Sequence, residues 1–225
     1  METNQTNIKQ DVEKAKSLFD KGMHYLSGDA CEKDLDAALS CFIRSVWYGY
    51  PRAARNVGVL LSSNVIENPD FEESFWYFLH AAKSGDNVAQ VEIGKFFCKV
   101  GAYKNSEYPP YNPYSANVWF EKAADAGNVQ AAFMYGVNLL DGLGCGQNIG
   151  RAEQYFEFGA EKGHVGCMYN LALICDGQAY GSFYFDEQKA GYWFNEAARK
   201  GNKQAIQMLN RYKYSNWTKK WSKKI

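Results

Sequence analysis

The stretch "WFEKAADAGNVQAAFMYG" (119–136) decides the fold, because close copies of it occur four more times along the 225-residue chain. The copies are "CFIRSVWYGYPRAARNVG" (41–58), "YFLHAAKSGDNVAQVEIG" (77–94), "YFEFGAEKGHVGCMYNLA" (155–172) and "WFNEAARKGNKQAIQMLN" (193–210). A glycine lies near the centre of each copy, and these glycines are 36, 42, 36 and 38 residues apart: Gly49, Gly85, Gly127, Gly163 and Gly201. Intervals of this length are typical of arrays of helical repeats.

Aromatic and small side chains recur at fixed distances from the central glycines. A phenylalanine lies seven residues before each glycine, at Phe42, Phe78, Phe120, Phe156 and Phe194. A small residue follows four positions after it, at Ala53, Ala89, Ala131, Cys167 and Ala205, and another nine positions after it, at Gly58, Gly94, Gly136 and Ala172. Glycine readily adopts the left-handed backbone conformation that ends a helix. The pattern therefore predicts pairs of closely packed antiparallel helices, with the phenylalanines filling the space between neighbouring pairs.

A single pair of helices cannot bury its own apolar face, so neighbouring pairs are expected to stack into a solenoid. Gly22 has the plus-nine position of a first copy whose central residue is Glu13. We therefore predict an all-α solenoid of about five helical hairpins, closed by a C-terminal capping helix over about 203–214. In this interpretation residues 1–10 form a polar extension, residues 11–214 the solenoid and residues 215–225 a basic tail that contains tryptophan.

The aromatic pair, "KAA", the central glycine, the small residue and "LG" or "YG" together resemble the Sel1-like repeat, a relative of the tetratricopeptide repeat. The resemblance covers roughly residues 11–214, although the first copy lacks the central glycine and the third carries an insertion. It implies a right-handed superhelix and a protein-binding scaffold without catalysis. An adaptor and an immunity protein that blocks a toxin both fit, and the resemblance does not identify the partner.

The composition is that of a soluble globular protein, with 46% hydrophobic and 22% charged residues and no net charge. No run of eighteen apolar residues is present, and the polar start lacks the features of a secretory signal, so we expect a cytoplasmic monomer. All 25 acidic residues precede Arg199, whereas nine of the 25 basic residues follow Glu196. Six irregularly spaced cysteines are consistent with reduced thiols inside a cell.

Two short motifs suggest chemistry but lack the context that it requires. The glycine-rich "GLGCGQNIG" (142–150) has neither a preceding strand nor the Lys-Ser/Thr pair of a phosphate-binding loop, so we interpret it as a turn between helices. His164 and Cys167, with Cys145 and Cys175 nearby, match no known spacing of metal ligands, and Cys167 has the position of a small core residue. We therefore expect no enzyme activity, no cofactor and no metal.

An alternative function comes from a secreted, cysteine-rich branch of the same family that binds β-lactams. In that branch, cysteines eight residues apart link the two helices across each turn. The equivalent pairs here are Ser45/Ala53, Ala81/Ala89, Ala123/Ala131, Gly159/Cys167 and Ala197/Ala205, so a single position of the ten is cysteine. A β-lactam-binding hydrolase is therefore the disfavoured alternative.

The resemblance to tetratricopeptide relatives implies that the helix after each turn lines the concave face. Positions three, six, ten and thirteen residues after the central glycine lie roughly 150° around that helix from its core positions. We predict that partner contacts come from Lys16, Phe19, Met23, Arg52, Arg55, Val59, Val88, Val91, Lys95, Gln130, Phe133, Val137, Gly166, Tyr169, Leu173, Asp176, Gln204, Gln207 and Arg211. Five are basic and only Asp176 is acidic, which favours an acidic protein or peptide. The alternative is that these charges only keep the surface hydrated.

The loop "KNSEYPPYNPYSA" (104–116) produces the longest interval and carries Tyr108, Tyr111 and Tyr114. Tyrosine offers a large contact surface at small entropic cost, and long loops in compact arrays are often functional. We therefore consider this loop a second candidate contact surface. The alternative is an insertion that folds against its own repeat.

The tail "RYKYSNWTKKWSKKI" (211–225) has two interpretations. Trp217 and Trp221 share one face if the tail is helical, with lysines around them. Such a patch would fit nucleic acid or anionic lipid. Alternatively, the tryptophans cover the apolar end of the last repeat, because a solenoid needs a cap. We favour the cap, and binding of nucleic acid is not expected.

Overall fold

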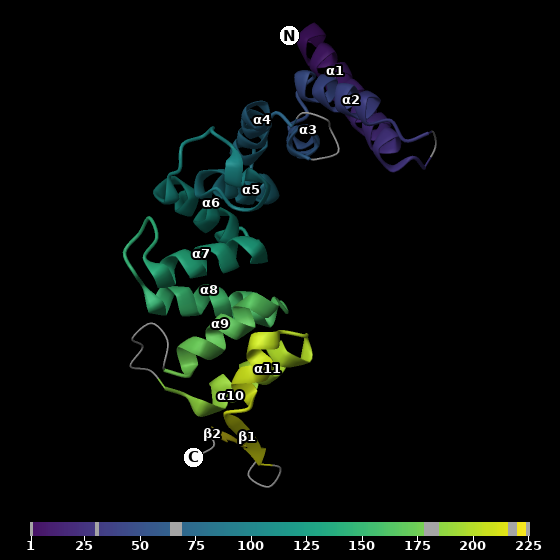
Figure 1. The fold of residues 1–225 in the computed structure, drawn as a ribbon. Helices are drawn as coiled ribbons and strands as arrows, with labels where there is room; N and C mark the ends of the chain where they lie inside the picture. The colour runs from purple at the N-terminus through teal and green to yellow at the C-terminus, as the bar shows by residue number, and fades with distance from the viewer. Residues whose placement is uncertain (1, 30–31, 64–68, 178–184, 216–219, 224–225) are drawn as a thin grey trace. The chain divides into compact units, whose positions relative to one another are not determined.

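The computed structural model describes residues 2–29, 32–63, 69–177, 185–215 and 220–223 of the chain. Within these residues it contains eleven α-helices, a short 3₁₀ helix and one pair of antiparallel strands (Figure 1). The residues form two compact units, 1–112 and 113–225, which are described separately. The predicted all-α repeat fold is confirmed.

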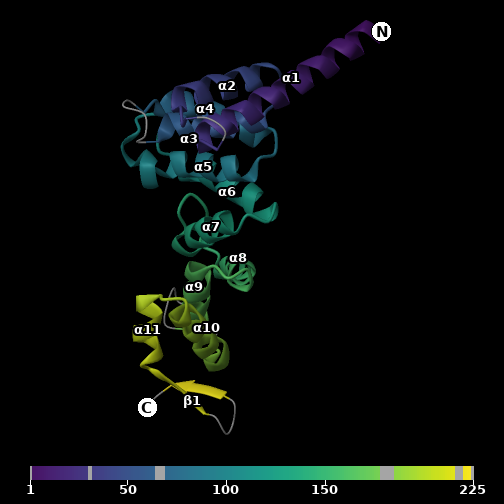
Figure 2. The same cartoon turned by 90° about the vertical axis from the view of Figure 1, so that its right-hand side faces the viewer.

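The first unit contains α1 (Glu2–Ser27), α2 (Leu35–Trp47), α3 (Arg52–Ser62), α4 (Phe71–Lys83), α5 (Asn87–Cys98) and the 3₁₀ helix η1 (Gly101–Asn105). Helix α1 has 26 residues, about twice the length of the others, and Figure 2 shows its N-terminal part running on past α2. The polar residues 2–10, predicted as an extension of the solenoid, are therefore helical.

The second unit contains α6 (Pro113–Asp125), α7 (Val129–Asp141), α8 (Ile149–Glu161), α9 (Val165–Cys175), α10 (Glu187–Arg199), α11 (Lys203–Leu209), β1 (Tyr212–Ser215) and β2 (Lys220–Lys223). Consecutive helices pack against each other from α6 through α11.

The central glycines adopt the backbone conformation that the sequence pattern requires. Their φ angles are 86°, 94°, 87°, 89° and 88° at Gly49, Gly85, Gly127, Gly163 and Gly201. After four of these turns the next residue caps the following helix, since the side chains of Asp86, Asn128, His164 and Asn202 accept hydrogen bonds from backbone N–H groups. The exception is α3, which follows Pro51 and has no side-chain cap. The predicted tight turns between helices are confirmed.

Glycine nine residues after a turn makes room for the phenylalanine of the next copy. A β-carbon on Gly58 would lie 2.9 Å from the ring of Phe78, and one on Gly136 would lie 2.7 Å from the ring of Phe156. The same relationship holds in the first copy, where a β-carbon on Gly22 would lie 2.7 Å from Phe42. All these phenylalanines are 1% exposed or less. The first copy therefore packs as a repeat although Glu13 replaces its central glycine.

The predicted helix over 203–214 is wrong beyond Leu209, where α11 ends. The chain continues as β1, which pairs with β2 in the register Tyr212↔Lys223 to Ser215↔Lys220. Strand β2 lies on α10, where the side chain of Trp221 covers Gly191. The backbone N–H and carbonyl groups of Trp221 form hydrogen bonds with the side-chain amide of Gln188. These long-range contacts favour strands over a continued helix, and Trp221, which was predicted on a helical face, lies in β2. Trp217 lies outside the described residues.

Candidate partner-binding site

The first unit carries nine of the predicted contact residues on α1, α3 and α5, and five of these are charged or aromatic: Lys16, Phe19, Arg52, Arg55 and Lys95. Lys16 and Arg52 are exposed, while Phe19, Arg55 and Lys95 are half-buried. Phe19 packs on the rings of Phe42 and Tyr50, with centroid distances of 5.6 and 5.2 Å, so much of its surface belongs to the core.

The prediction that Val91 faces a partner is wrong, because this side chain is buried. Arg55 has the equivalent position on α3 but remains partly exposed. A valine at the boundary of the core gains from burial, whereas an arginine keeps its charged end in solvent. On α5 the exposed aliphatic residue is Val88 instead.

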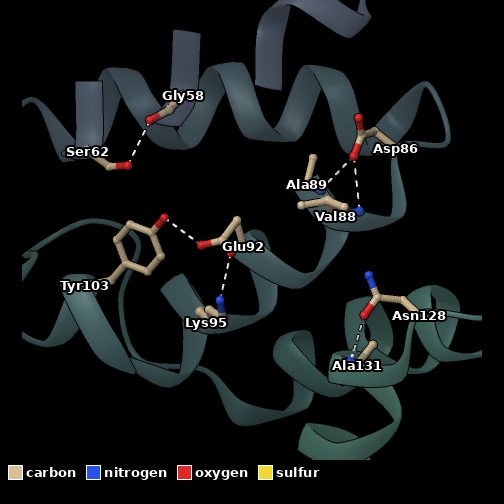
Figure 3. A network of polar contacts seen from close by, with 10 residues as sticks. All are labelled: Gly58, Ser62, Asp86, Val88, Ala89, Glu92, Lys95, Tyr103, Asn128 and Ala131. Atoms are coloured by element: carbon tan, nitrogen blue, oxygen red, sulfur yellow. Dashed lines mark hydrogen bonds and ion pairs between the residues drawn. The ribbon is translucent and has the colours of Figure 1, made fainter. Parts of the chain in front are cut away.

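An ion pair fixes Arg55 across two neighbouring repeats. Its Nη1 lies 3.1 Å from Oδ2 of Asp86, the residue that follows the central glycine of the next copy. The other carboxylate oxygen of Asp86 accepts hydrogen bonds from the backbone N–H groups of Val88 (3.1 Å) and Ala89 (2.9 Å), as Figure 3 shows. Asp86 therefore caps α5 and holds Arg55 at once. Asp86 lies in the turn itself, so helical periodicity does not place it among the predicted contact positions.

A second ion pair compensates the charge of Lys95. Its Nζ lies 2.7 Å from Oε1 of Glu92, whose Oε2 accepts a hydrogen bond of 2.8 Å from the hydroxyl of Tyr103 (Figure 3). Burial, with the nearby carboxylate of Glu92, raises the pKa of Tyr103, so this hydroxyl stays a donor at neutral pH. Lys95 is thereby connected to the insertion after α5 and presents little uncompensated charge.

An open cleft of about 530 Å³ lies between the start of α3 and the turn from α4 to α5. Its polar lining comes from Tyr50, Arg52, Arg55, Ser84, Asp86 and Asn87. Two guanidinium groups therefore face one carboxylate. Of the predicted contact residues, the structure brings Arg52 and Arg55 together in this cleft.

The second unit carries the other ten predicted contact positions, among them Gln130, Phe133, Tyr169, Gln204, Gln207 and Arg211. Phe133 is half-buried, and its ring lies 4.9 Å from that of His164. Gln130, Gln204, Gln207 and Arg211 are exposed. This unit thus offers a polar, largely uncharged helix face.

Asp176 was predicted as the single acid of the groove, and this is wrong because its side chain is 1% exposed. It accepts a hydrogen bond from the hydroxyl of Tyr212, the first residue of β1, and one of its oxygens lies 4.0 Å from Nη1 of Arg211. The strand that follows α11 covers this carboxylate. The acids beside the cations of α3 and α5 are Asp86 and Glu92.

One part of the tyrosine loop packs against its own unit, and two of its tyrosines remain exposed. Tyr108 is half-buried, with its ring 5.2 Å from that of Phe75 and 5.8 Å from that of Trp76. The Nζ of Lys99 donates to the backbone carbonyls of Ser106 (2.7 Å) and Pro109, which holds this part against its own unit. Tyr111 and Tyr114 are 55% and 69% exposed, so these two remain candidates for contact.

The glycine-rich loop 142–148 is a structural turn, as predicted. The carbonyl of Leu143 accepts a hydrogen bond of 2.7 Å from the amide of Asn117, whose oxygen accepts another of 2.7 Å from Asn138. Gly144 has a φ of 69° and packs against the backbone of Pro113, which leaves no room for a β-carbon. The buried amides and this close approach together account for the composition of the loop.

His164 and Cys167 also have structural roles. Nδ1 of His164 accepts the backbone N–H of Cys167 at 3.2 Å and so caps α9. Cys167 is completely buried, as predicted for a small core residue, and burial raises the pKa of its thiol to about 12. Five cysteines lie in the described part of the chain, and none of them forms a disulfide: Cys41, Cys98, Cys145, Cys167 and Cys175. No group of three potential metal ligands occurs among the described residues.

The model of the Sel1 repeat family matches residues 15–46, 51–86, 89–128, 129–164 and 165–202. Among curated proteins, the chain is 29% identical over 138 residues to "Chitin synthase regulatory factor 2" of Schizosaccharomyces pombe. That match covers 61% of this chain and 27% of the relative, so the chain spans about a quarter of the relative's length.

Two solved structures share the fold. One is c5321, a protective antigen present in uropathogenic Escherichia coli strains, with a TM-score of 0.78 and 23% identity over 87% of this chain and 40% of that chain. The other is a Sel1 repeat protein from Oxalobacter formigenes, with a TM-score of 0.73 and 24% identity over 88% of this chain and 76% of that chain. Among the described residues, none of the helices combines the length and the apolar character needed to cross a bilayer.

Proposed function

We propose, since the chain belongs to the Sel1 repeat family, that it is a non-enzymatic module that binds a protein or peptide through the helix face of α1, α3 and α5. One observation carries the proposal: the reactive side chains are used structurally, while cations on this face remain accessible. His164 caps a helix and Cys167 is buried, whereas Lys16 and Arg52 are exposed. A surface of this kind suits recognition better than catalysis.

The charges of this face support an acidic partner. Arg52 and Lys16 form no ion pair with a carboxylate among the described residues, whereas Arg55 and Lys95 are paired with Asp86 and Glu92. An acidic partner would place carboxylates beside the two unpaired cations. Such complementarity mainly accelerates association and excludes wrong partners.

The biological role would be that of a monomeric adaptor or of an immunity protein that blocks a toxin. The name of the Schizosaccharomyces pombe relative, a regulatory factor, favours an adaptor that controls another protein. The described cysteines form no disulfide, which supports a reducing compartment such as the cytoplasm. A β-lactam hydrolase is not favoured, because Cys167 lacks a cysteine partner across its turn, where Gly159 stands.

The test is capture of partners by the wild-type chain and by a Lys16→Glu/Arg52→Glu variant. We expect the partner recovered by the wild type to be lost from this variant, because reversed charges repel an acidic surface. The matched control is Arg44→Glu/Lys83→Glu, which reverses two exposed cations on α2 and α4. If all three proteins capture the same partner equally, the proposed face is not the contact surface.

A further inference from the structure

The cleft between α3 and the turn after α4 gathers two arginines of the proposed contact face. We propose that this cleft binds the carboxylate of an aspartate or glutamate side chain on the partner, with Arg52 and Arg55 as its receptors. The inference rests on the proposed function, since it names the group that the interaction module recognises.

The cleft is open enough to admit a side chain and is lined for an anion. Its volume is about 530 Å³, and Arg52 and Arg55 lie one helical turn apart on α3. Tyr50, Ser84 and Asn87 add a hydroxyl or amide at its walls. These groups can donate hydrogen bonds to a carboxylate that the arginines hold.

Arg55 is held in place and still has donors to offer. Its Nη1 makes the contact with Asp86, while a guanidinium has five N–H donors in a fixed planar arrangement. Asp86 is occupied by Arg55 and by the N–H groups of Val88 and Ala89. Arg55 is therefore oriented by one carboxylate and can receive a second one with its remaining N–H groups.

The lining of the cleft carries a formal net charge of +1, because it contains two arginines and one aspartate. A single carboxylate neutralises this charge, whereas a phosphate group would exceed it. We therefore favour a carboxylate over a phosphorylated side chain.

The pair of arginines is unique among the copies of the repeat. The equivalent positions, three and six residues after the turn, hold Lys16/Phe19, Val88/Val91, Gln130/Phe133, Gly166/Tyr169 and Gln204/Gln207. Repeat packing requires no cation at these positions, since five of the six copies do without the pair. Arg55 also links two repeats through Asp86, whereas Arg52 has no ion pair among the described residues and is best explained by a ligand.

The test measures the affinity of the full chain for a short fluorescein-labelled peptide rich in glutamate and for its twin with glutamine at every glutamate position. Fluorescence anisotropy should show binding of the glutamate peptide that is about tenfold tighter than that of the glutamine peptide. Arg52→Gln and Arg55→Gln should each remove most of this difference. The control Arg44→Gln removes an exposed cation outside the cleft and should preserve it.

The variant Asp86→Asn should change the affinity for the glutamate peptide in the opposite direction. Asparagine is an adequate helix cap in this fold, since Asn128 and Asn202 have the same position in two other copies. Without the competing carboxylate the glutamate peptide should bind several-fold more tightly. Thermal melting of each variant establishes that it is folded.

Several results would overturn the inference: equal affinity for the two peptides, no binding of either, or an undiminished preference in Arg52→Gln and Arg55→Gln. Tighter binding of a phosphoserine version than of the glutamate peptide would assign the cleft to phosphate instead. These outcomes are distinct from failure of the proposed function. If the chain captures its partner through Lys16 and Arg52 but binds the two peptides equally, the proposed interaction module is supported and the carboxylate site is rejected.

Discussion

Cys167 fills the space that a β-carbon on Gly159 would need. Such a β-carbon would lie 3.0 Å from the Cβ of Cys167 and nearer still to its sulfur. In three other copies the two residues that face each other across the turn are both alanine, as in Ala81 and Ala89. At the turn of Gly163 the pair of alanines is thus replaced by glycine and cysteine. The side chain of Cys167 occupies the volume that two alanine side chains share at those three turns.

This exchange predicts strong coupling between the two positions. Gly159→Ala should destabilise the protein by about 1–3 kcal/mol, because it overpacks a closed contact. Adding Cys167→Ala should recover most of that loss, since it recreates the pair of alanines found at other turns. Urea denaturation of the wild type, both single variants and the double variant measures the coupling. Simple additivity of the two single effects would show that the side chains do not share this space.

The histidine cap of α9 predicts a dependence of stability on pH. Burial lowers the pKa of His164 below its ordinary value, and its Nδ1 must stay unprotonated to accept the N–H of Cys167. Protonation therefore favours the unfolded chain. The contribution of the cap is present above the unfolded pKa of about 6.5 and is lost as the pH falls through that value toward the lower folded pKa.

The measurement is the free energy of unfolding of the wild type and of His164→Asn between neutral and mildly acidic pH. Asparagine caps the equivalent helices after Gly127 and Gly201 and does not titrate, so the variant should lose less stability on acidification. Parallel curves for the two proteins would mean that the cap does not titrate in this range.

The contact between β2 and α10 predicts that Gly191 is intolerant of substitution. A β-carbon there would lie 2.5 Å from the ring of Trp221, so Gly191→Ala should displace the strand and lower Tm. Gly150→Ala is the matched control, because a β-carbon at that helical position meets nothing closer than 3.8 Å. Equal melting temperatures for the two variants would show that the strand adds no stability.

Deletion of 215–225 separates the two interpretations of the basic tail. If the tail covers the last repeat, the truncated chain should melt earlier and associate, because the apolar surface around Gly191 becomes exposed. Its binding to DNA and to anionic liposomes should equal that of the full chain at every salt concentration. A truncated chain that melts normally but loses salt-dependent binding would support the nucleic-acid or lipid interpretation.

The hydrogen bonds of Asn117 beneath the glycine-rich loop predict a loss of stability when this residue is replaced. Asn117→Ala would leave the carbonyl of Leu143 and the amide of Asn138 without their bonds. Each buried polar group that loses its partner costs about 1–3 kcal/mol. Asn105→Ala, at an exposed asparagine at the end of η1, is the comparison. Similar unfolding midpoints for the two variants would show that water replaces the lost partners.

The sequence by itself determined the repeat and its turns. A left-handed backbone at the end of a helix requires glycine, and a phenylalanine ring against the next helix requires a residue without a side chain. Both are local demands that recur in most copies, so the spacing of the glycines and phenylalanines predicted closely packed helices, and the structure added that Gly58 faces Phe78. The structural role of Cys167 followed in the same way, from its place in a row of alanines.

The tertiary structure alone decided which charges meet and where the chain leaves the helical pattern. Arg55 and Asp86 are 31 residues apart, and Gln188 and Trp221 are 33 apart. Asp176 is buried because Tyr212, 36 residues later, lies over it. Helical periodicity assigns a residue to a face of its own helix, but it does not say which distant segment covers that face. The cleft of Arg52 and Arg55 therefore became visible only when the turn after α4 was in place beside α3.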